Sequence, residues 1–152
     1  TFDFKLTEGA NSGVKYFVNE TYNSGMSAIG LEYQVLDDEK HPDAKLGTVG
    51  NRTLASLYDI IPSYKLDPRF RKKIGEWNQG RIIVYPNNIV QHWLNGFKVV
   101  EYERKSNIFK VLVAHSKHKV WDGFGAQDSG PILFQEHGDS VFYKNIKIRE
   151  IN

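Results

Sequence analysis

A carboxylate and a carboxamide occupy alternate positions in one short apolar run. Glu32 and Gln34 lie between Leu31, Tyr33 and Val35. Successive side chains of a strand point to opposite faces, so the two polar groups would project side by side, roughly 7 Å apart, away from the apolar set. Such a pair can bind a polyhydroxylated ligand, or can hold a general base next to a hydrogen-bond partner of the substrate. The alternative is a polar pair that faces solvent.

A second polar pair, Gln135 and His137, alternates with Ile132 and Phe134 near the end of the chain. If the two apolar residues belong to the core, the polar pair shares the opposite face. Histidine titrates near neutral pH and can act as acid or base without a large pKa shift. The alternative is a surface histidine at a strand end. Both polar pairs would share one sheet face if their strands are neighbours, which is an assumption.

A cluster of possible metal ligands follows the first pair, in a long polar segment that extends to about residue 56. It contains Asp37, Asp38, His41 and Asp43. Carboxylates and an imidazole could bind a divalent cation through oxygen and nitrogen. The spacing matches neither an EF-hand nor an HExxH motif. Solvated loop charges are the alternative.

Aromatic rings offer another route to carbohydrate binding, because a flat ring can stack on the apolar face of a sugar. The candidates are Trp77, Trp93, Trp121, Tyr58 and Tyr64, and core packing is the alternative for each. Trp77 and Arg81 are four residues apart on one expected strand and should face the same side. An arginine there could stabilise a developing oxyanion or enolate. His92 shares a strand face with two apolar residues, which favours a buried, hydrogen-bonded histidine.

The elements that must position these groups are strands. Two-residue alternation runs through residues 14–18, 31–35, 81–84 and 141–148. Asn95-Gly96 predicts a tight hairpin, and a Pro-Asn-Asn turn precedes it. No helix of three turns is expected. The sequence therefore predicts an all-β fold of antiparallel strands, arranged as two packed sheets.

Composition excludes several classes of function. A length of 152 residues predicts a single domain, 1–152, with one core. The net charge of +2 comes from interspersed charges, which argues against a nucleic-acid partner. No apolar stretch approaches the roughly 20 residues of a transmembrane helix. The chain has no cysteine, so it has neither disulfides nor thiolate metal sites. Gln34 and Leu36 stand where the Glu32 strand would carry a second carboxylate, so a two-carboxylate glycosidase is not supported from this strand.

Several segments together resemble the bacterial 3-keto-disaccharide (3-keto-glycoside) hydrolase domains, once called DUF1080. They are EGANSGVKYFV, GLEYQVLDDEKHPDA, SLYDIIP, GEWNQGRIIVYPNNIVQHWLNGFKVVEY and GPILFQEHGDSVFYKNIKIREI, in the family's order. The resemblance implies a concanavalin A-like jelly-roll sandwich of two antiparallel sheets with the ligand on a concave face. It also implies that the N-terminal strands of the family are absent from this chain or supplied by a separate segment. The open sheet edge would then favour self-association. A periplasmic or secreted location is expected by the same resemblance.

The implied chemistry needs one base, one oxyanion stabiliser and one acid. A ketone at C3 of a sugar acidifies the hydrogen on C2, so that proton removal can expel the aglycone from C1. On this interpretation Glu32 or His137 is the base, and Arg81 or a loop-bound divalent cation stabilises the oxyanion. The sugar would be held by Gln34, Gln135, Trp77, Tyr58 and Lys15. The alternative function is a carbohydrate-binding module on the same sandwich, without turnover.

Overall fold

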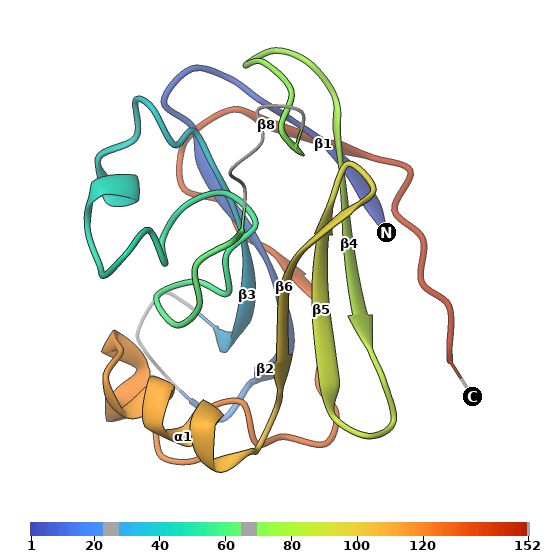
Figure 1. The fold of residues 1–152 in the computed structure, drawn as a ribbon. Coiled ribbons are helices and arrows are strands. Elements are labelled where there is room, and N and C mark those ends of the chain that lie inside the picture. The colour runs from blue at the N-terminus through green and yellow to red at the C-terminus, as the bar shows by residue number, and fades with distance from the viewer. Residues whose placement is uncertain (23–27, 65–69, 152) are drawn as a thin grey trace.

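The computed structural model describes residues 1–22, 28–64 and 70–151, and most of their regular structure is β-strand (Figure 1). The strands are β1 (Phe2–Leu6), β2 (Asn11–Asn19), β3 (Ile29–Leu36), β4 (Asn78–Val84), β5 (Ile89–Leu94), β6 (Phe97–Glu103), β7 (Leu133–Phe134) and β8 (Val141–Lys144). One α-helix, α1 (Asn107–Ala114), and the 3-10 turns η1 (Pro42–Lys45) and η3 (Lys117–Val120) complete the named elements. None of the helices in these ranges is long and apolar enough to cross a membrane.

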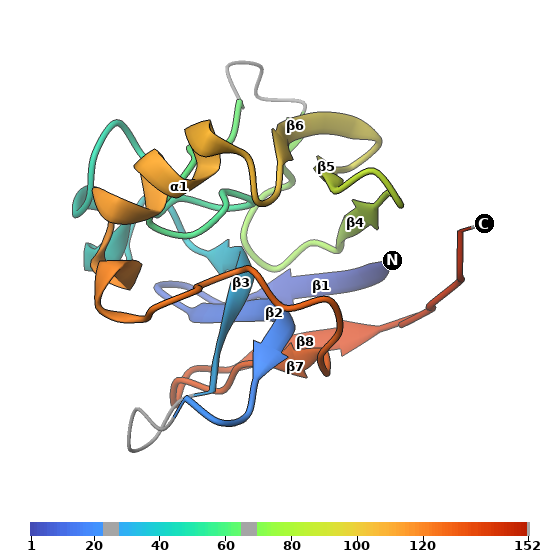
Figure 2. The same ribbon diagram turned by 90° about the horizontal axis from the view of Figure 1, so that it is seen from below.

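The strands form two antiparallel sheets, as predicted. One sheet has five strands in the order β6-β5-β4-β1-β8, and the other has three in the order β3-β2-β7. Figure 2 shows β4, β5 and β6 on one side of β1, with β2 and β7 on the other. Strand β2 pairs with β3 over most of its length and with β7 on its other edge. The central strand of the small sheet therefore joins both polar segments that the sequence singled out.

The turn chemistry of the sequence explains the β5–β6 hairpin. Asn95 has φ 50° and Gly96 has φ 86°, the pair of positive angles that a type I′ turn requires. The Asn95 side chain also accepts a hydrogen bond from the Gln79 N–H at 2.8 Å, which ties the turn to β4. The predicted hairpin is thus confirmed.

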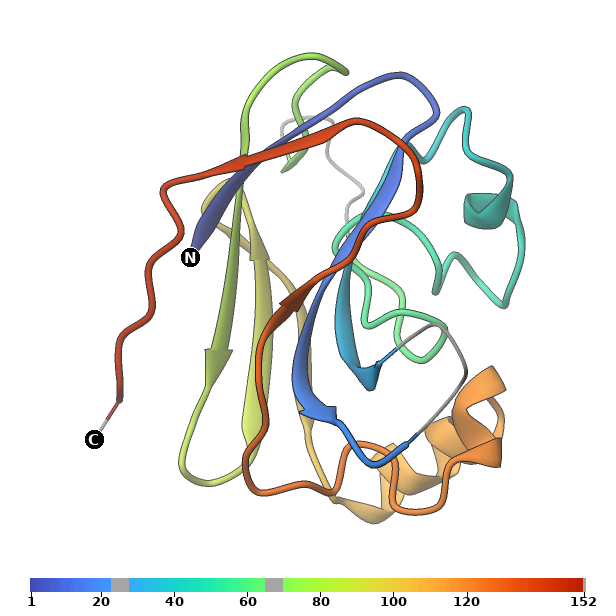
Figure 3. The same cartoon turned by 180° about the vertical axis from the view of Figure 1, so that it is seen from behind.

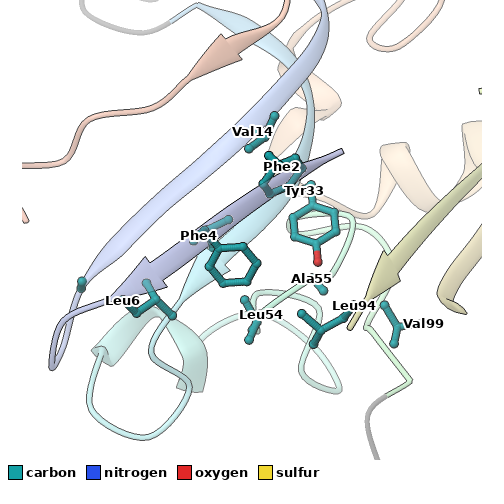
Figure 4. Packing of buried hydrophobic residues seen from close by; sticks show 11 residues of the cluster. Phe2, Phe4, Leu6, Val14, Tyr33, Leu54, Ala55, Leu94 and Val99 are labelled. Atoms are coloured by element: carbon teal, nitrogen blue, oxygen red, sulfur yellow. The ribbon is translucent and has the colours of Figure 1, made fainter. Parts of the chain in front are cut away.

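The core lies between the two sheets and is rich in aromatic rings. Figure 4 shows Phe2, Phe4 and Leu6 of β1 facing Tyr33 of β3 and Leu94 of β5. His92 also belongs to this layer: the Tyr16 hydroxyl lies 2.7 Å from its Nε2, and the Ala55 carbonyl lies 3.0 Å from its Nδ1. The expectation of a buried, hydrogen-bonded histidine is confirmed.

Three local features differ from the sequence-based expectation. Helix α1 was not predicted; the Ser106 side chain caps it by accepting the Phe109 N–H, and Phe109 is buried. The alternation expected through residue 148 ends with β8, and the red C-terminal segment runs outward beyond it (Figure 3). Ile132, expected in the core, is 48% exposed because β7 is only two residues long and begins after it.

Candidate functional site

A cavity of about 560 Å³ lies against the face of the small sheet that points away from the core. This volume falls within the range of small-molecule sites. The alternation of β2 and β3 sends Lys15, Glu32 and Gln34 to this face, while their apolar neighbours pack into the core. The full lining is Asn11, Lys15, Ile29, Gly30, Glu32, Gln34, His41, Asp43, Tyr58, Lys117, His118, Trp121, Gln135 and His137.

Glu32 is the buried acid of the cavity. Only 6% of its surface is exposed, and it faces Lys15 across the β2–β3 register with 3.9 Å between its Oε2 and Lys15 Nζ. When the Gln34 carboxamide is oriented by its hydrogen bonds, its nitrogen donates to Glu32 Oε1 at 3.1 Å and to the Ser12 carbonyl at 2.9 Å. Burial raises the pKa of Glu32 to about 7, although the nearby lysine cations oppose that shift.

Lys117 and His118, from the η3 turn after α1, form the opposite wall. Lys117 Nζ lies 4.0 Å from the centre of the Tyr58 ring, and burial lowers the pKa of this lysine despite the attraction of Glu32. The His118 ring stacks on Phe124, with ring centres 4.2 Å apart and planes at 16°. Burial, reinforced by the neighbouring lysine charge, lowers the pKa of His118 to about 4, so its imidazole is neutral at pH 7.

A network of ionic hydrogen bonds fixes the wall that carries Tyr58. The Tyr58 hydroxyl donates to Asp43 Oδ2 at 2.8 Å. Arg52 donates to Asp43 at 2.9 Å and to Asp59 at 2.5 Å, and Asp59 in turn accepts the Lys117 N–H at 2.7 Å. The loop and the η3 turn are therefore held together behind the cavity.

Gln135 and His137 close the cavity on the β7 side. The Gln135 N–H donates to the Gly13 carbonyl at 2.8 Å, which continues the pairing of β2 beyond the end of β7. Its side-chain Oε1 is buried and has no hydrogen-bond partner among the described residues, so a ligand hydroxyl could donate to it. His137 lies at the exposed rim. The predicted meeting of the two polar pairs on one sheet face is thus present.

Two of the predicted catalytic and sugar-binding residues do not line this cavity. Arg81 lies on β4, in the five-stranded sheet, where its register partner is Trp93. Trp77 precedes the same strand, and its ring lies beneath Lys144 Nζ at 3.9 Å and Lys5 Nζ at 5.3 Å. Their shared strand face is therefore the outer face of the other sheet. The sequence pattern gave their orientation along the strand but not the sheet to which the strand belongs.

The predicted metal ligands form hydrogen bonds within the loop instead of converging on one point. Asp37 accepts the Gly9 N–H at 2.8 Å and the Glu39 N–H at 3.0 Å, while Asp38 accepts the Leu54 N–H at 2.6 Å. His41 Nδ1 accepts the Asp43 N–H at 3.2 Å. Within residues 1–22, 28–64 and 70–151 no group of three or more such side chains is arranged to hold a metal ion. The described geometry therefore favours the alternative interpretation, in which these four residues are loop charges and not metal ligands.

Sequence reasoning missed Lys117 and His118, and it placed Trp121 only among general candidate rings. The segment that contains them lacks the alternation that identified the other site residues. Its one usable signal is a pair of serines, Ser106 and Ser116, which cap α1 and η3. Those caps predict helical turns, but they do not indicate where the turns pack.

The fold and the cavity define a β-sandwich protein with a buried carboxylate in a cavity on one sheet face. The sequence adds a more specific assignment. A family model described as the 3-keto-alpha-glucoside-1,2-lyase-like domain matches residues 1–149, and the chain belongs to that family.

Proteins similar to this chain include one curated protein and two solved structures. The 3-keto-disaccharide hydrolase of Bacteroides thetaiotaomicron is 35% identical over 169 residues; the match covers 99% of this chain and 57% of that protein. A "putative glycosyl hydrolase" structure from Parabacteroides distasonis superposes with a TM-score of 0.78 at 26% identity, covering 95% of this chain and 67% of the other. A second from the same organism gives 0.67 at 27% identity, covering 99% and 76%. This chain thus spans little more than half the length of the curated relative.

Proposed function

We propose that this chain cleaves 3-keto-glycosides, with Glu32 as the base that removes the proton from C2 of the sugar. The observation that carries the proposal is a buried carboxylate with a pKa of about 7 in a polar cavity that two lysines line. A general base works best when its pKa lies near the operating pH. The family assignment and the name of the curated relative support the substrate class.

The reaction proceeds by elimination. Glu32 takes the C2 proton, and the electron pair of that C–H bond moves toward C3 to form an enediolate whose charge lies on the former ketone oxygen. When the enediolate collapses, the C1–O bond breaks and the aglycone leaves with its oxygen, which takes up a proton. Addition of water to the resulting enone completes a net hydrolysis. This series of reaction steps requires one base and does not require two opposed carboxylates.

Lys15 and Lys117 are suited to stabilise the enediolate oxygen. Both ammonium groups are near enough to Glu32 to affect its pKa, so both lie close to the charge that forms during proton transfer. Cations in a water-poor site stabilise a developing oxyanion more strongly than cations in bulk water. They replace Arg81 in this role, because Arg81 lies on the other sheet.

The remaining groups bind the sugar and release the aglycone. Gln135 offers to a sugar hydroxyl a buried Oε1 that no other residue in the described part of the chain hydrogen-bonds. Tyr58 and Trp121 present aromatic rings at the cavity. The proposal gives His137, at the rim, the role of protonating the leaving oxygen. His118, held neutral, can donate a hydrogen bond without adding charge.

The test is release of aglycone from a chromogenic 3-keto-glucoside, with the matching glucoside as the substrate control. We expect turnover of the keto sugar alone, and a loss of at least ~100-fold in Glu32→Gln with binding retained. Binding without release by the unaltered protein would favour the carbohydrate-binding module instead. Full activity in Glu32→Gln would reject Glu32 as the base.

A further inference from the structure

Gly13 occupies the middle of the cavity-facing row of β2. Its neighbours in that row, Asn11 and Lys15, both line the cavity, while the alternate residues Ser12 and Val14 are buried beneath. Gly13 is the register partner of Gln34 on β3, and its carbonyl accepts the Gln135 N–H. Its φ lies outside the left-handed region, so the backbone here would accept any L-residue. The reason for a glycine must therefore be sought in the space above the strand.

That space is filled by the side chain of Glu32. A Cβ built on Gly13 would lie 2.9 Å from Glu32 Cγ and 2.8 Å from Glu32 Cδ, and closer still to Oε1. Real Cβ atoms essentially never approach other atoms so closely. The carboxylate arm thus rests directly on the backbone of β2, the strand that separates β3 from β7.

We propose that Gly13 is a positioning residue, whose missing side chain lets Glu32 lie across β2 beside the Gln34 amide. This inference rests on the proposed function of Glu32 as the base. With any side chain at position 13, the carboxylate must rotate away from β2. It then loses the hydrogen bond from Gln34, which is donated at 3.1 Å, and no longer holds its direction toward the bound sugar.

The test is Gly13→Ala, with Gly80→Ala as the matched control. Gly80 is also a strand glycine with φ outside the left-handed region, but it lies on the five-stranded sheet, and its added Cβ would overlap the Phe2 ring in the core instead of the Glu32 side chain. We expect Gly13→Ala to lower kcat on the 3-keto-glucoside about 100-fold, because a displacement of roughly 1 Å can cost that much. The inflection of its pH–rate profile should also fall below that of the parent protein, since the displaced carboxylate is better hydrated. Gly80→Ala should lose thermal stability and keep the parent's profile.

A double-variant cycle separates positioning from a general packing defect. Replacement of Glu32 by alanine removes both the base and the crowded side chain. In that background Gly13→Ala should change activity by no more than about twofold, and any loss of Tm caused by Gly13→Ala alone should be recovered. An equal further loss of activity, or a Tm deficit that persists without Glu32, would show that the contact is not the cause.

The same variants also distinguish the positioning role of Gly13 from the role of Glu32 as the base. Parental activity and an unshifted profile in Gly13→Ala, alongside an inactive Glu32→Ala, would overturn the positioning role and leave the base assignment standing. An active Glu32→Ala would overturn the proposed function itself.

Discussion

The Lys15 ammonium hydrogen-bonds to a carbonyl and only approaches Glu32. Its Nζ donates to the Ala28 carbonyl at 2.9 Å, whereas the distance to Glu32 Oε2 is 3.9 Å. Both side chains are nearly buried, so their attraction is little screened. A close ion pair would stabilise the carboxylate and make it a poor base. At this separation the lysine keeps the ionised form accessible near neutral pH without removing its basicity.

The pH dependence of turnover follows from this pair. Glu32 must be ionised to accept a proton, so kcat/KM should rise with pH through an inflection near 7, the pKa that burial gives it. Lys15→Met should move the inflection upward, because Lys15 lowers the pKa of Glu32. Initial rates across pH 5 to 9 measure both. An inflection in Lys15→Met at or below that of the parent protein would contradict the assignment.

The stability of the folded protein should also depend on the ionisation of Glu32. Folding raises the pKa of Glu32 from 4.5 to about 7. Ionisation of Glu32 therefore lowers the free energy of unfolding as the pH rises through this range, with the full effect above pH 7 and none below pH 4.5. Glu32→Gln should therefore be more stable than the parent at pH 8, by up to about 3 kcal/mol, and nearly equal to it at pH 4. Urea unfolding at the two pH values gives the comparison. If Glu32→Gln were less stable than the parent at pH 8, the ionised carboxylate would stabilise the fold, contrary to this prediction.

His137→Ala should lower turnover without changing the stability of the fold. The side chain is exposed, so we expect a change in unfolding free energy within about 0.5 kcal/mol. If His137 protonates the leaving oxygen, turnover of an alkyl 3-keto-glucoside should fall by at least ~100-fold. A nitrophenyl aglycone, which leaves without protonation, should show a much smaller loss. Equal losses on both substrates would assign His137 to binding.

Arg81→Ala and Trp77→Ala should leave kcat/KM within about twofold of the parent value. Arg81 lies on β4 of the five-stranded sheet and Trp77 directly precedes that strand, and neither lines the cavity. Steady-state kinetics on the same 3-keto-glucoside tests this, with Tyr58→Phe as a variant at the cavity wall. A tenfold or greater loss of kcat/KM in Arg81→Ala would indicate that Arg81 acts in the site after all.

Asp37→Ala should destabilise the loop that bears one wall of the cavity. The Asp37 carboxylate accepts backbone N–H groups from both Gly9 and Glu39, and the residue is 3% exposed. The loss of these bonds should cost about 1–3 kcal/mol of unfolding free energy. Thermal unfolding measures it, and the same scan with EDTA checks the metal hypothesis. Loss of parental stability or activity in EDTA, with recovery on adding a divalent cation, would restore a metal role.

Alternation and turn chemistry predicted the parts of the fold that depend on local sequence. The Asn95-Gly96 hairpin and the faces of β2 and β3 could be predicted because φ preferences and the two-residue period act within a few residues. The same logic placed Glu32 and Gln34 together on one face of their strand, and Gln135 and His137 together on one face of theirs. That the two strands are neighbours was an assumption, and the structure places β2 between them. Strand neighbours are set by packing over long sequence distances, which local patterns do not report.

The errors have the same origin. Trp77 and Arg81 do share a strand face, but nothing local assigns β4 to the larger sheet. The loop aspartates have metal-ligating chemistry, yet backbone N–H groups and Arg52 use their lone pairs. Lys117 and His118 reach the cavity only because η3 packs beside Tyr58 and Phe124. Each outcome depends on a tertiary contact that a single sequence does not encode locally.

The pairing of Val14 with Phe134 joins the two ends of the site across most of the chain. During synthesis the strand bearing Glu32 emerges before Gln135 and His137, which follow it by more than a hundred residues. Contacts of such long range form slowly and late. A nascent chain would therefore hold the Glu32 carboxylate in an open and hydrated setting, and the proposed site would be complete only when β7 pairs with β2.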